Sequence, residues 1–186
     1  MKKEDQRSRL TKKLIEDAFI DILASKPINT VSVKEVCEKA QINRSTFYSY
    51  YEDIYALYDS IKDIIRENIQ AYLESYGKLD KNYNFYNEIF RFFIENKKVV
   101  KIFIGMQVDN EFVAELLQMA EDKVYSIYKK KYLLINERKF RNYFTFASMG
   151  CIGIINKWIK DGMKEDFETI AKIAEEISIK GIKYMY

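Results

Sequence analysis

The stretch that decides the fold runs from residue 30 to residue 58 and reads TVSVKEVCEKAQINRSTFYSYYEDIYALY. Within it, Ser32 and Glu35 have the spacing of a capping box, in which a hydroxyl and a carboxylate three residues later cap the start of a helix. Asn43 is placed to cap a second short helix, and Asp53 to cap a longer one. These signals predict two short helices joined by a tight turn and followed by a third, long helix.

Two helices joined by a short turn have the geometry of a helix-turn-helix. Such a unit needs a small residue at the helix crossing, an apolar residue in the turn and a buried residue on the second helix. Cys37, Ile42 and Phe47 meet these needs. Residues at the start of the second helix would then face outward, where a helix of this kind meets base edges in the major groove. They are Arg44, Ser45, Thr46, Tyr48 and Ser49, and none is acidic.

Four aromatic residues crowd into five positions of this stretch: Phe47, Tyr48, Tyr50 and Tyr51. We expect Phe47 and Tyr51 to pack inward. Tyr48 and Tyr50 would carry their hydroxyls to the phosphate backbone of a nucleic acid, a contact that positions a protein without reading sequence. The alternative is that all four rings belong to the core and tie the short helix to the long one.

Apolar residues recur at helical spacing through the rest of the chain, and no stretch alternates with period two. Leu10, Leu14 and Ala18 mark a first helix that ends near Pro27. Further helices are expected over residues 54–76, 86–93, 99–104, 113–128, 137–161 and 166–186. The predicted fold is all-α. A three-helix N-terminal domain, residues 1–53, is joined by a long fourth helix to a helical domain, residues 54–186.

Composition excludes several functions. The 186 residues contain no histidine and two distant cysteines, so histidine-dependent catalysis, most metal sites and a disulfide framework are not expected. No segment is apolar enough to cross a membrane, and the charged N-terminus is unlike a signal peptide. We therefore expect a cytoplasmic protein without cofactor, metal or membrane partner. The net charge is only +3, so any contact with DNA must depend on local placement of charge.

From the capping box to the long fourth helix, these residues resemble the DNA-binding signature of the tetracycline-repressor-like (TetR) family of transcriptional regulators. The family pattern is roughly T-V-x-x-I-A-x-x-A-G-V-S-x-G-T-F-Y-x-H-F-x-x-K-x-x-L. Thr46, Phe47 and Tyr48 match its T-F-Y, and Tyr50 with Tyr51 stands for H-F. The resemblance implies DNA contacts by Ser32, Lys34, Arg44, Ser45, Thr46, Tyr48, Ser49 and Tyr50.

The chain departs from this pattern at two positions. Gln41 replaces the glycine of the turn and must tolerate whatever backbone conformation the turn imposes. Ile54 replaces a lysine that reaches a phosphate in the family. Basic residues near the N-terminus can compensate, or they can form an ordinary solvated face; they are Arg7, Arg9, Lys12 and Lys13.

Small residues recur every three positions near residue 150, which lets two helices approach closely. The family dimerises through its C-terminal helices, so the resemblance implies a homodimer built as a four-helix bundle. The expected interface is Ala147, Gly150, Gly153, Ile170, Ala174 and Ile177. The alternative is that both helices pack only within one chain. The pattern Gly150, Gly153, Trp158, Gly162 also resembles a subgroup that includes dihydroxyacetone-kinase regulators.

The family also holds an inducer pocket in its C-terminal domain. Asn68 is expected on the inward face of the fourth helix, where a polar side chain needs a partner. A structural hydrogen bond or an exposed edge position would explain Asn68 equally simply. The expected pocket is apolar and lined by Asn68, Tyr72, Phe93, Phe103 and Phe144.

Three classes of function compete. The first is a dimeric, sequence-specific DNA-binding repressor that recognises a palindromic operator and is released by a small apolar or aromatic effector. The second is a DNA-binding protein whose helical body is a protein-interaction or structural module without a ligand. The third is a helical enzyme, which the missing histidines and the lack of a glycine-rich phosphate loop disfavour.

Overall fold

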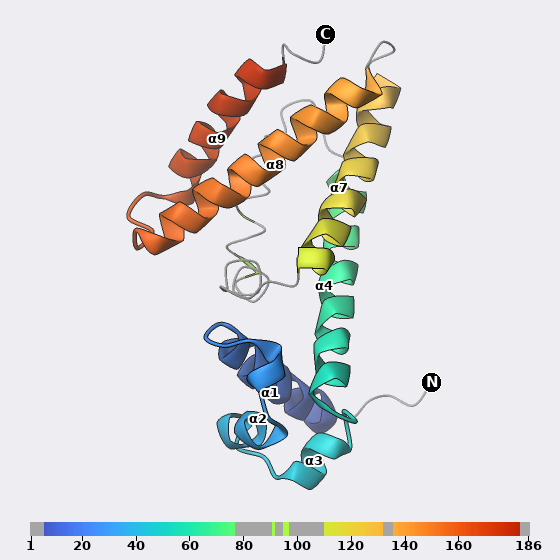
Figure 1. Cartoon of the computed structure of the whole chain (residues 1–186), viewed down its shortest axis with the longest axis vertical. Helices are drawn as coiled ribbons and strands as arrows, with labels where there is room; N and C mark the ends of the chain where they lie inside the picture. The colour runs from blue at the N-terminus through green and yellow to red at the C-terminus, as the bar shows by residue number, and fades with distance from the viewer. Residues whose placement is uncertain (1–5, 77–90, 92–94, 97–109, 132–135, 183–186) are drawn as a thin grey trace. The chain divides into compact units, whose positions relative to one another are not determined.

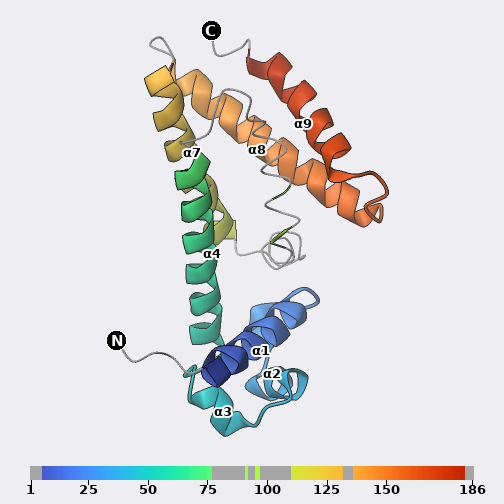
Figure 2. The same ribbon diagram turned by 180° about the vertical axis from the view of Figure 1, so that it is seen from behind.

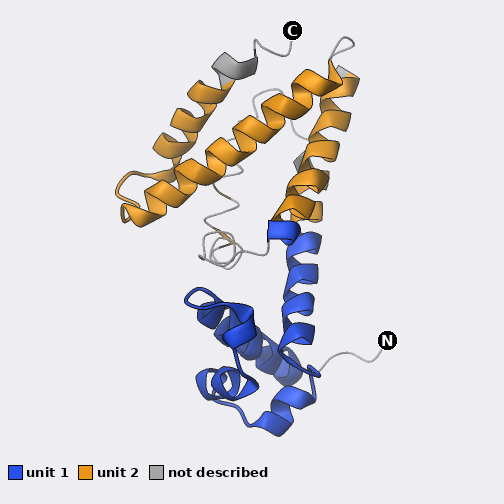
Figure 3. Ribbon diagram, viewed as in Figure 1, with its two compact units in different colours: residues 1–68, 97–112 blue, residues 69–96, 113–186 orange. Residues whose placement is uncertain are grey.

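The computed structural model describes residues 6–76, 91, 95–96, 110–131 and 136–182. Regular structure in these ranges is helical and includes no strand, so the all-α prediction is confirmed (Figure 1). The chain forms two compact units, residues 1–68 with 97–112 and residues 69–96 with 113–186 (Figure 3). The change from one unit to the other falls within the long fourth helix. The predicted domains, residues 1–53 and 54–186, stay a prediction.

The first unit contains the predicted helix-turn-helix (Figures 1 and 2). Its elements are α1 (Gln6–Leu23), a 3-10 turn (Ile28–Thr30), α2 (Val33–Ala40), α3 (Arg44–Tyr48) and the first part of α4 (Ile54–Tyr76). Phe19, Phe47 and Leu57 are fully buried, and they come from α1, α3 and α4. The core of this unit is therefore shared by its helices.

The three predicted caps are confirmed. Ser32 and Glu35 form a reciprocal capping box at the start of α2. The Oδ1 atom of Asn43 accepts the backbone N–H of Thr46 at 2.7 Å, and Oδ1 of Asp53 accepts that of Ala56 at 2.8 Å. Each cap satisfies a backbone donor that the helix itself cannot pair.

The first helix is where the apolar spacing predicts it, but two of the residues that mark it lie on its exposed side. Leu10 and Leu14 are 60% and 45% exposed, whereas Ile15 and Phe19 are fully buried. Both pairs have the four-residue spacing of a helix face, so spacing alone does not choose between them. Tertiary packing determines which pair is buried, because the Phe19 ring meets the ring of Tyr58 on α4 edge-on, with centroids 6.3 Å apart.

The turn between α2 and α3 places Gln41 in the left-handed region, with φ 55° and ψ 44°. The backbone N–H of Gln41 bonds to the last carbonyls of α2, and that of Ile42 donates to the oxygen of Cys37 at 3.0 Å. The turn thus imposes on Gln41 the conformation for which glycine is ordinarily chosen, at a cost of about 1–2 kcal/mol for a residue with a Cβ atom.

The second unit contains the C-terminal helices. They are α7 (Asn110–Lys131), whose first residues belong to the first unit, α8 (Glu137–Lys160) and α9 (Phe167–Ile182). Asn136 caps α8 and Asp166 caps α9, while Gly162 with φ 86° follows the end of α8. The helix predicted over residues 99–104 lies outside the described residues, and of the one predicted over residues 86–93 only Arg91 is described, in helical conformation.

Specific contacts join the helices of the second unit. The guanidinium of Arg141 on α8 bonds to Asp122 on α7 at 3.1 Å, and it also pairs with Glu137 of α8 itself at 2.9 Å. The indole N–H of Trp158 donates to the carbonyl of Glu165 at 3.0 Å, which ties α8 to the loop before α9. Across the described part of the chain, no helix is long and apolar enough to cross a membrane.

We expect Gln41→Gly to stabilise the protein by about 0.5–1 kcal/mol. The glycine removes the strain of a Cβ atom in the left-handed region, and its greater freedom in the unfolded chain offsets part of the gain. Urea denaturation measures the change. Gln41→Ala keeps the Cβ atom and is the control. Equal stabilisation by both variants would show that the Cβ atom is not the source of the cost.

Candidate nucleic-acid interface

The short helix α3 is fixed to the first unit by one aromatic side chain. The Phe47 ring is fully buried, with the Tyr48 ring edge-on at 5.6 Å and the Tyr51 ring tilted at 5.8 Å. Tyr51 is also buried, as predicted, whereas Tyr48 is 55% exposed. The reading in which all four rings belong to the core therefore does not hold for Tyr48.

The outward residues predicted for α3 lie on one short exposed surface. Arg44, Ser45, Tyr48 and Ser49 are exposed, and Thr46 is half-buried. Ser32 and Lys34, the two candidates at the start of α2, are exposed as well. The structure thus brings the predicted contact residues of α2 and α3 together within one unit.

The hydroxyls of this surface already donate within the chain. Oδ1 of Asn43 accepts the hydroxyls of Ser45 and Thr46, each at 2.7 Å, and the Ser49 hydroxyl donates to the carbonyl of Thr46 at 2.7 Å. A hydroxyl has a single proton to donate. In this arrangement these three side chains can accept, but they cannot donate to a phosphate.

Two side chains of α3 have hydrogen-bond donors that are available to a bound molecule. The Arg44 guanidinium and the Tyr48 hydroxyl make no side-chain hydrogen bond within the described residues. Arginine can bond in bidentate fashion to the O6 and N7 atoms of guanine, and a tyrosine hydroxyl suits a phosphate. Arg44 and Tyr48 are therefore the strongest candidates on this helix.

Ser32 is a weaker candidate than the sequence suggested. Its backbone N–H and its hydroxyl both donate to Oε2 of Glu35, each at 2.9 Å. Ser32 can donate to a phosphate only if the Glu35 side chain moves. Lys34 is easier to recruit, because its ammonium lies 3.7 Å from Glu38 in an exposed ion pair of the kind that contributes little.

Glu35 is held in its charged form by these same contacts. Its hydrogen bond from Lys26, followed by those from the backbone and hydroxyl of Ser32, lowers its pKa from 4.5 to about 2. The Lys26 ammonium lies 2.5 Å from Oε1 of Glu35 and also donates to the carbonyl of Thr30. Lys26 therefore neutralises an acidic group next to the proposed phosphate contacts.

Tyr50 differs from the prediction that its hydroxyl faces a phosphate. The side chain is half-buried, and its hydroxyl lies 3.1 Å from Oγ of Ser8 on α1. Ser8 is 42 residues away in sequence, so no local pattern could have indicated this partner.

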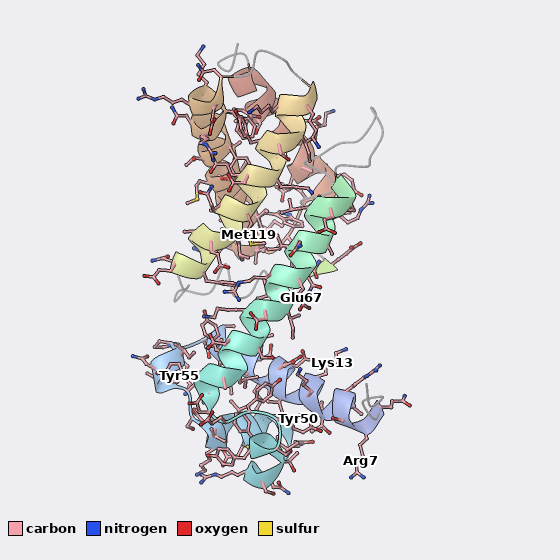
Figure 4. The ribbon with its side chains drawn as sticks, turned by 90° about the vertical axis from the view of Figure 1, so that its right-hand side faces the viewer. Arg7, Lys13, Tyr50, Tyr55, Glu67 and Met119 are labelled. Atoms are coloured by element: carbon pink, nitrogen blue, oxygen red, sulfur yellow. The ribbon has the colours of Figure 1, made fainter. Side chains whose placement is uncertain are left out.

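Two of the basic residues of α1 lie on opposite sides of the helix. Arg7 points to the side on which α3 lies, and Lys13 points to the other side (Figure 4).

The expected pocket residues give a mixed result. Asn68 is exposed, so the edge-position alternative describes it better than an inward face. Phe144 stacks on Phe140 with centroids 6.1 Å apart, within a cluster around Val124 and Phe140. Tyr72 is half-buried. Phe93 and Phe103 lie outside the described residues.

No group of side chains suited to a metal ion occurs in the described ranges.

Part of the expected dimer interface already packs within the chain. Ile170 and Ala174 are 7% and 1% exposed, so their predicted place at a partner's surface is wrong. They lie four residues apart on the buried side of α9. Gly150 and Gly153 are exposed, Ala147 is half-buried, and Ile177 is 51% exposed.

Comparisons with known proteins agree with this geometry. A family model of the TetR type, described as "Transcriptional regulator C-terminal region", matches residues 80–180, more than half of the chain. The HTH-type dhaKLM operon transcriptional activator DhaS of Lactococcus lactis subsp. lactis (strain IL1403) is 31% identical over 96 residues. That match covers 46% of this chain and 51% of DhaS, about half the length of the relative.

Solved structures share the fold. The fatty acid degradation regulator FadR from Bacillus halodurans has a TM-score of 0.71 at 14% identity, covering 95% of this chain and 96% of its own. FadR from Bacillus subtilis, solved in complex with stearoyl-CoA, has a TM-score of 0.66 at 12% identity, covering 91% of this chain and 98% of its own.

We expect the contribution of Glu35 to stability to depend on pH. A carboxyl whose pKa is lowered by folding stabilises the native state above its unfolded pKa, and that stabilisation is lost as pH falls through the folded pKa. The difference in Tm between the wild type and Glu35→Gln should therefore be full above about pH 4.5 and shrink toward pH 2. Thermal melts followed by circular dichroism across this range measure it.

Glu38→Gln is the matched control, because it breaks only the exposed pair with Lys34 and should change Tm little. A difference in Tm between the wild type and Glu35→Gln that stays constant as the pH falls would contradict the lowered pKa of Glu35.

Proposed function

Because the chain belongs to the TetR family of transcriptional regulators, we propose that it binds a two-fold-symmetric DNA operator as a dimer and reads it with α3. The family consists of regulators, which agrees with the expectation that the chain is not an enzyme. The observation that carries the proposal is the surface of α3, where Arg44 and Tyr48 keep donors for a partner while Phe47 anchors the helix.

The two side chains have different roles in this proposal. Arg44 is at the N-terminal end of α3, the end of a recognition helix that meets base edges. Tyr48 is at its C-terminal end, and its ring rests edge-on against the buried Phe47 ring. A hydroxyl on so rigid a support suits a fixed phosphate. In this proposal Arg44 determines which base is preferred, and Tyr48 fixes the position of α3 on the DNA backbone.

Arg44→Ala should relax specificity at one position of each half-site, at a cost of about 1–3 kcal/mol for the preferred base. The operator is first selected from a random duplex library with the wild-type protein. Affinities of both proteins are then measured for the four possible bases at each position. A uniform loss of affinity for all four bases would show that Arg44 contacts only the backbone.

Tyr48→Phe should weaken binding to every sequence alike, because a phosphate contact carries no sequence information. The same set of operator variants, measured by fluorescence anisotropy, provides the comparison, and Arg44→Ala is its matched contrast. A changed order of base preference in Tyr48→Phe would assign this hydroxyl to a base edge and overturn the backbone role.

We place the dimer interface on an apolar face of α8 and α9. On α8 the face follows the helical spacing of Phe146, Met149, Gly150 and Gly153, all exposed. A Cβ atom built at either glycine would meet nothing within 4 Å. Among the described residues the two glycines therefore serve no close packing, although each costs about 1 kcal/mol in a helix. A helix of a second subunit that packs closely against α8 would explain why glycine occupies these two positions.

Replacing both Gly150 and Gly153 with Leu should give monomers. The single chain has room for the new side chains, and leucine favours a helix, so the fold itself should be retained. Light scattering measures the mass, and circular dichroism checks helicity. Ser126→Leu, at an exposed position of α7, is the control. A double variant that keeps the mass of a dimer would place the interface elsewhere.

The direction of control and the effector are separate parts of the proposal. The FadR of Bacillus subtilis was solved in complex with stearoyl-CoA, and DhaS is named an operon activator. We keep the proposal of a small apolar or aromatic effector that releases a repressor from DNA. By linkage, such an effector weakens DNA binding by as much as DNA weakens effector binding, typically about 1–3 kcal/mol.

Two measurements separate the remaining alternatives. Transcription from the selected operator, with and without the protein, distinguishes a repressor from an activator. Titration of the protein–operator complex with fatty acyl-CoA and with aromatic acids tests release. If no compound of either class changes the affinity, the second reading remains, in which the helical body is a protein-interaction or structural module.

A further inference from the structure

Two adjacent tyrosines that follow α3 both bond to α1. The Tyr50 hydroxyl lies 3.1 Å from Oγ of Ser8, and the Tyr51 hydroxyl lies 3.1 Å from Oε1 of Glu16. At about 1.5 Å of rise per residue, these two points are about 12 Å apart along α1. The bond from Tyr50 lies near the N-terminal end of α1, whereas the bond from Tyr51 lies beside the fully buried Ile15, where core packing also holds the helix.

The contact at Ser8 lies in the first turn of α1. Gln6, Arg7 and Leu10 around it are exposed, so little apolar packing supports this turn. Terminal turns of helices fray where tertiary contacts are few. The hydroxyl of Thr11, one turn farther along α1, donates to the carbonyl of Arg7 at 3.0 Å. The bond from Tyr50 adds a link from this turn to the end of α3.

Arg7 directly precedes Ser8, and α1 begins beside α3 (Figures 1 and 2). The Arg7 side chain extends from α1 on the side of α3, whereas Lys13 points away (Figure 4). A DNA backbone that flanks a groove occupied by α3 would pass this end of α1. Arg7 is thus well placed to supply the charge that Ile54 does not.

We propose that Tyr50 is a positioning residue for DNA binding, which holds the first turn of α1 through Ser8 so that Arg7 meets a phosphate. This inference rests on the proposed function and replaces the direct phosphate contact expected of Tyr50. The Tyr50 hydroxyl has one proton, and its partner in the structure is Ser8. The effect of Tyr50 on affinity therefore passes through Arg7.

A double-mutant cycle on Tyr50→Phe and Arg7→Ala tests this, with dissociation constants for the selected operator measured at several salt concentrations. Tyr50→Phe alone should weaken binding about 3- to 10-fold, the range of one hydrogen bond. Arg7→Ala should weaken binding and reduce the salt slope by about 1. The double variant should bind no more weakly than Arg7→Ala.

Other variants separate positioning from general damage. Ser8→Ala should match Tyr50→Phe, whereas Ser8→Thr keeps the hydroxyl and should bind like the wild type. Tyr51→Phe, which loses the bond to Glu16 farther along α1, should leave the operator affinity unchanged. In the free protein, Tyr50→Phe should speed amide hydrogen exchange at residues 10–13, whose backbone N–H groups bond to the carbonyls of the first turn of α1, without altering exchange in α4.

The outcomes are distinct. If the losses in the double variant multiply, Tyr50 contacts DNA itself, and this inference is overturned while the proposed function stands. Unchanged exchange at residues 10–13 in Tyr50→Phe would overturn it as well. A wild-type protein that selects no operator would overturn the proposed function, and the inference with it.

Discussion

A helix of five residues cannot hold itself together in water, because nucleation costs more than so few backbone bonds return. The proposed reading surface depends on such a helix, Arg44–Tyr48. The fully buried Phe47 ring anchors it in the core, and the side chain of Asn43 closes its first turn. Arg44 and Tyr48 have defined positions only because these two residues hold the backbone between them.

The Asn43 carboxamide has a second effect, on what the surface can recognise. By accepting the hydroxyls of Ser45 and Thr46 it turns their lone pairs, and not their protons, toward solvent. Serine and threonine can bond to bases or phosphates as donors or as acceptors, so the direction of these bonds matters. The surface of α3 therefore offers hydroxyl oxygens as acceptors around the Arg44 donor. It can bind fewer kinds of partner than a surface on which the same hydroxyls were free to donate.

Local patterns were sufficient for much of the fold. Ser32, Asn43 and Asp53 were assigned as caps because each acts on a backbone group three residues away. The errors come where a choice depends on distant packing. Leu10 and Ile15 both fit a helix face, and only the contacts of α1 decide which is buried. Ile170 and Ala174 were assigned to a partner's surface for the same reason. The link between Tyr50 and Ser8 joins two elements that no periodicity connects.

The left-handed conformation of Gln41 has a consequence for recognising such domains in other sequences. Its backbone is set by the bonds that end α2 and by the cap that begins α3, so the turn forms without glycine. A search pattern that demands glycine at this position would reject chains whose turn is intact. The paired signals on either side, a capping box that begins nine residues before Gln41 and a capping side chain just after it, are the more dependable diagnostic.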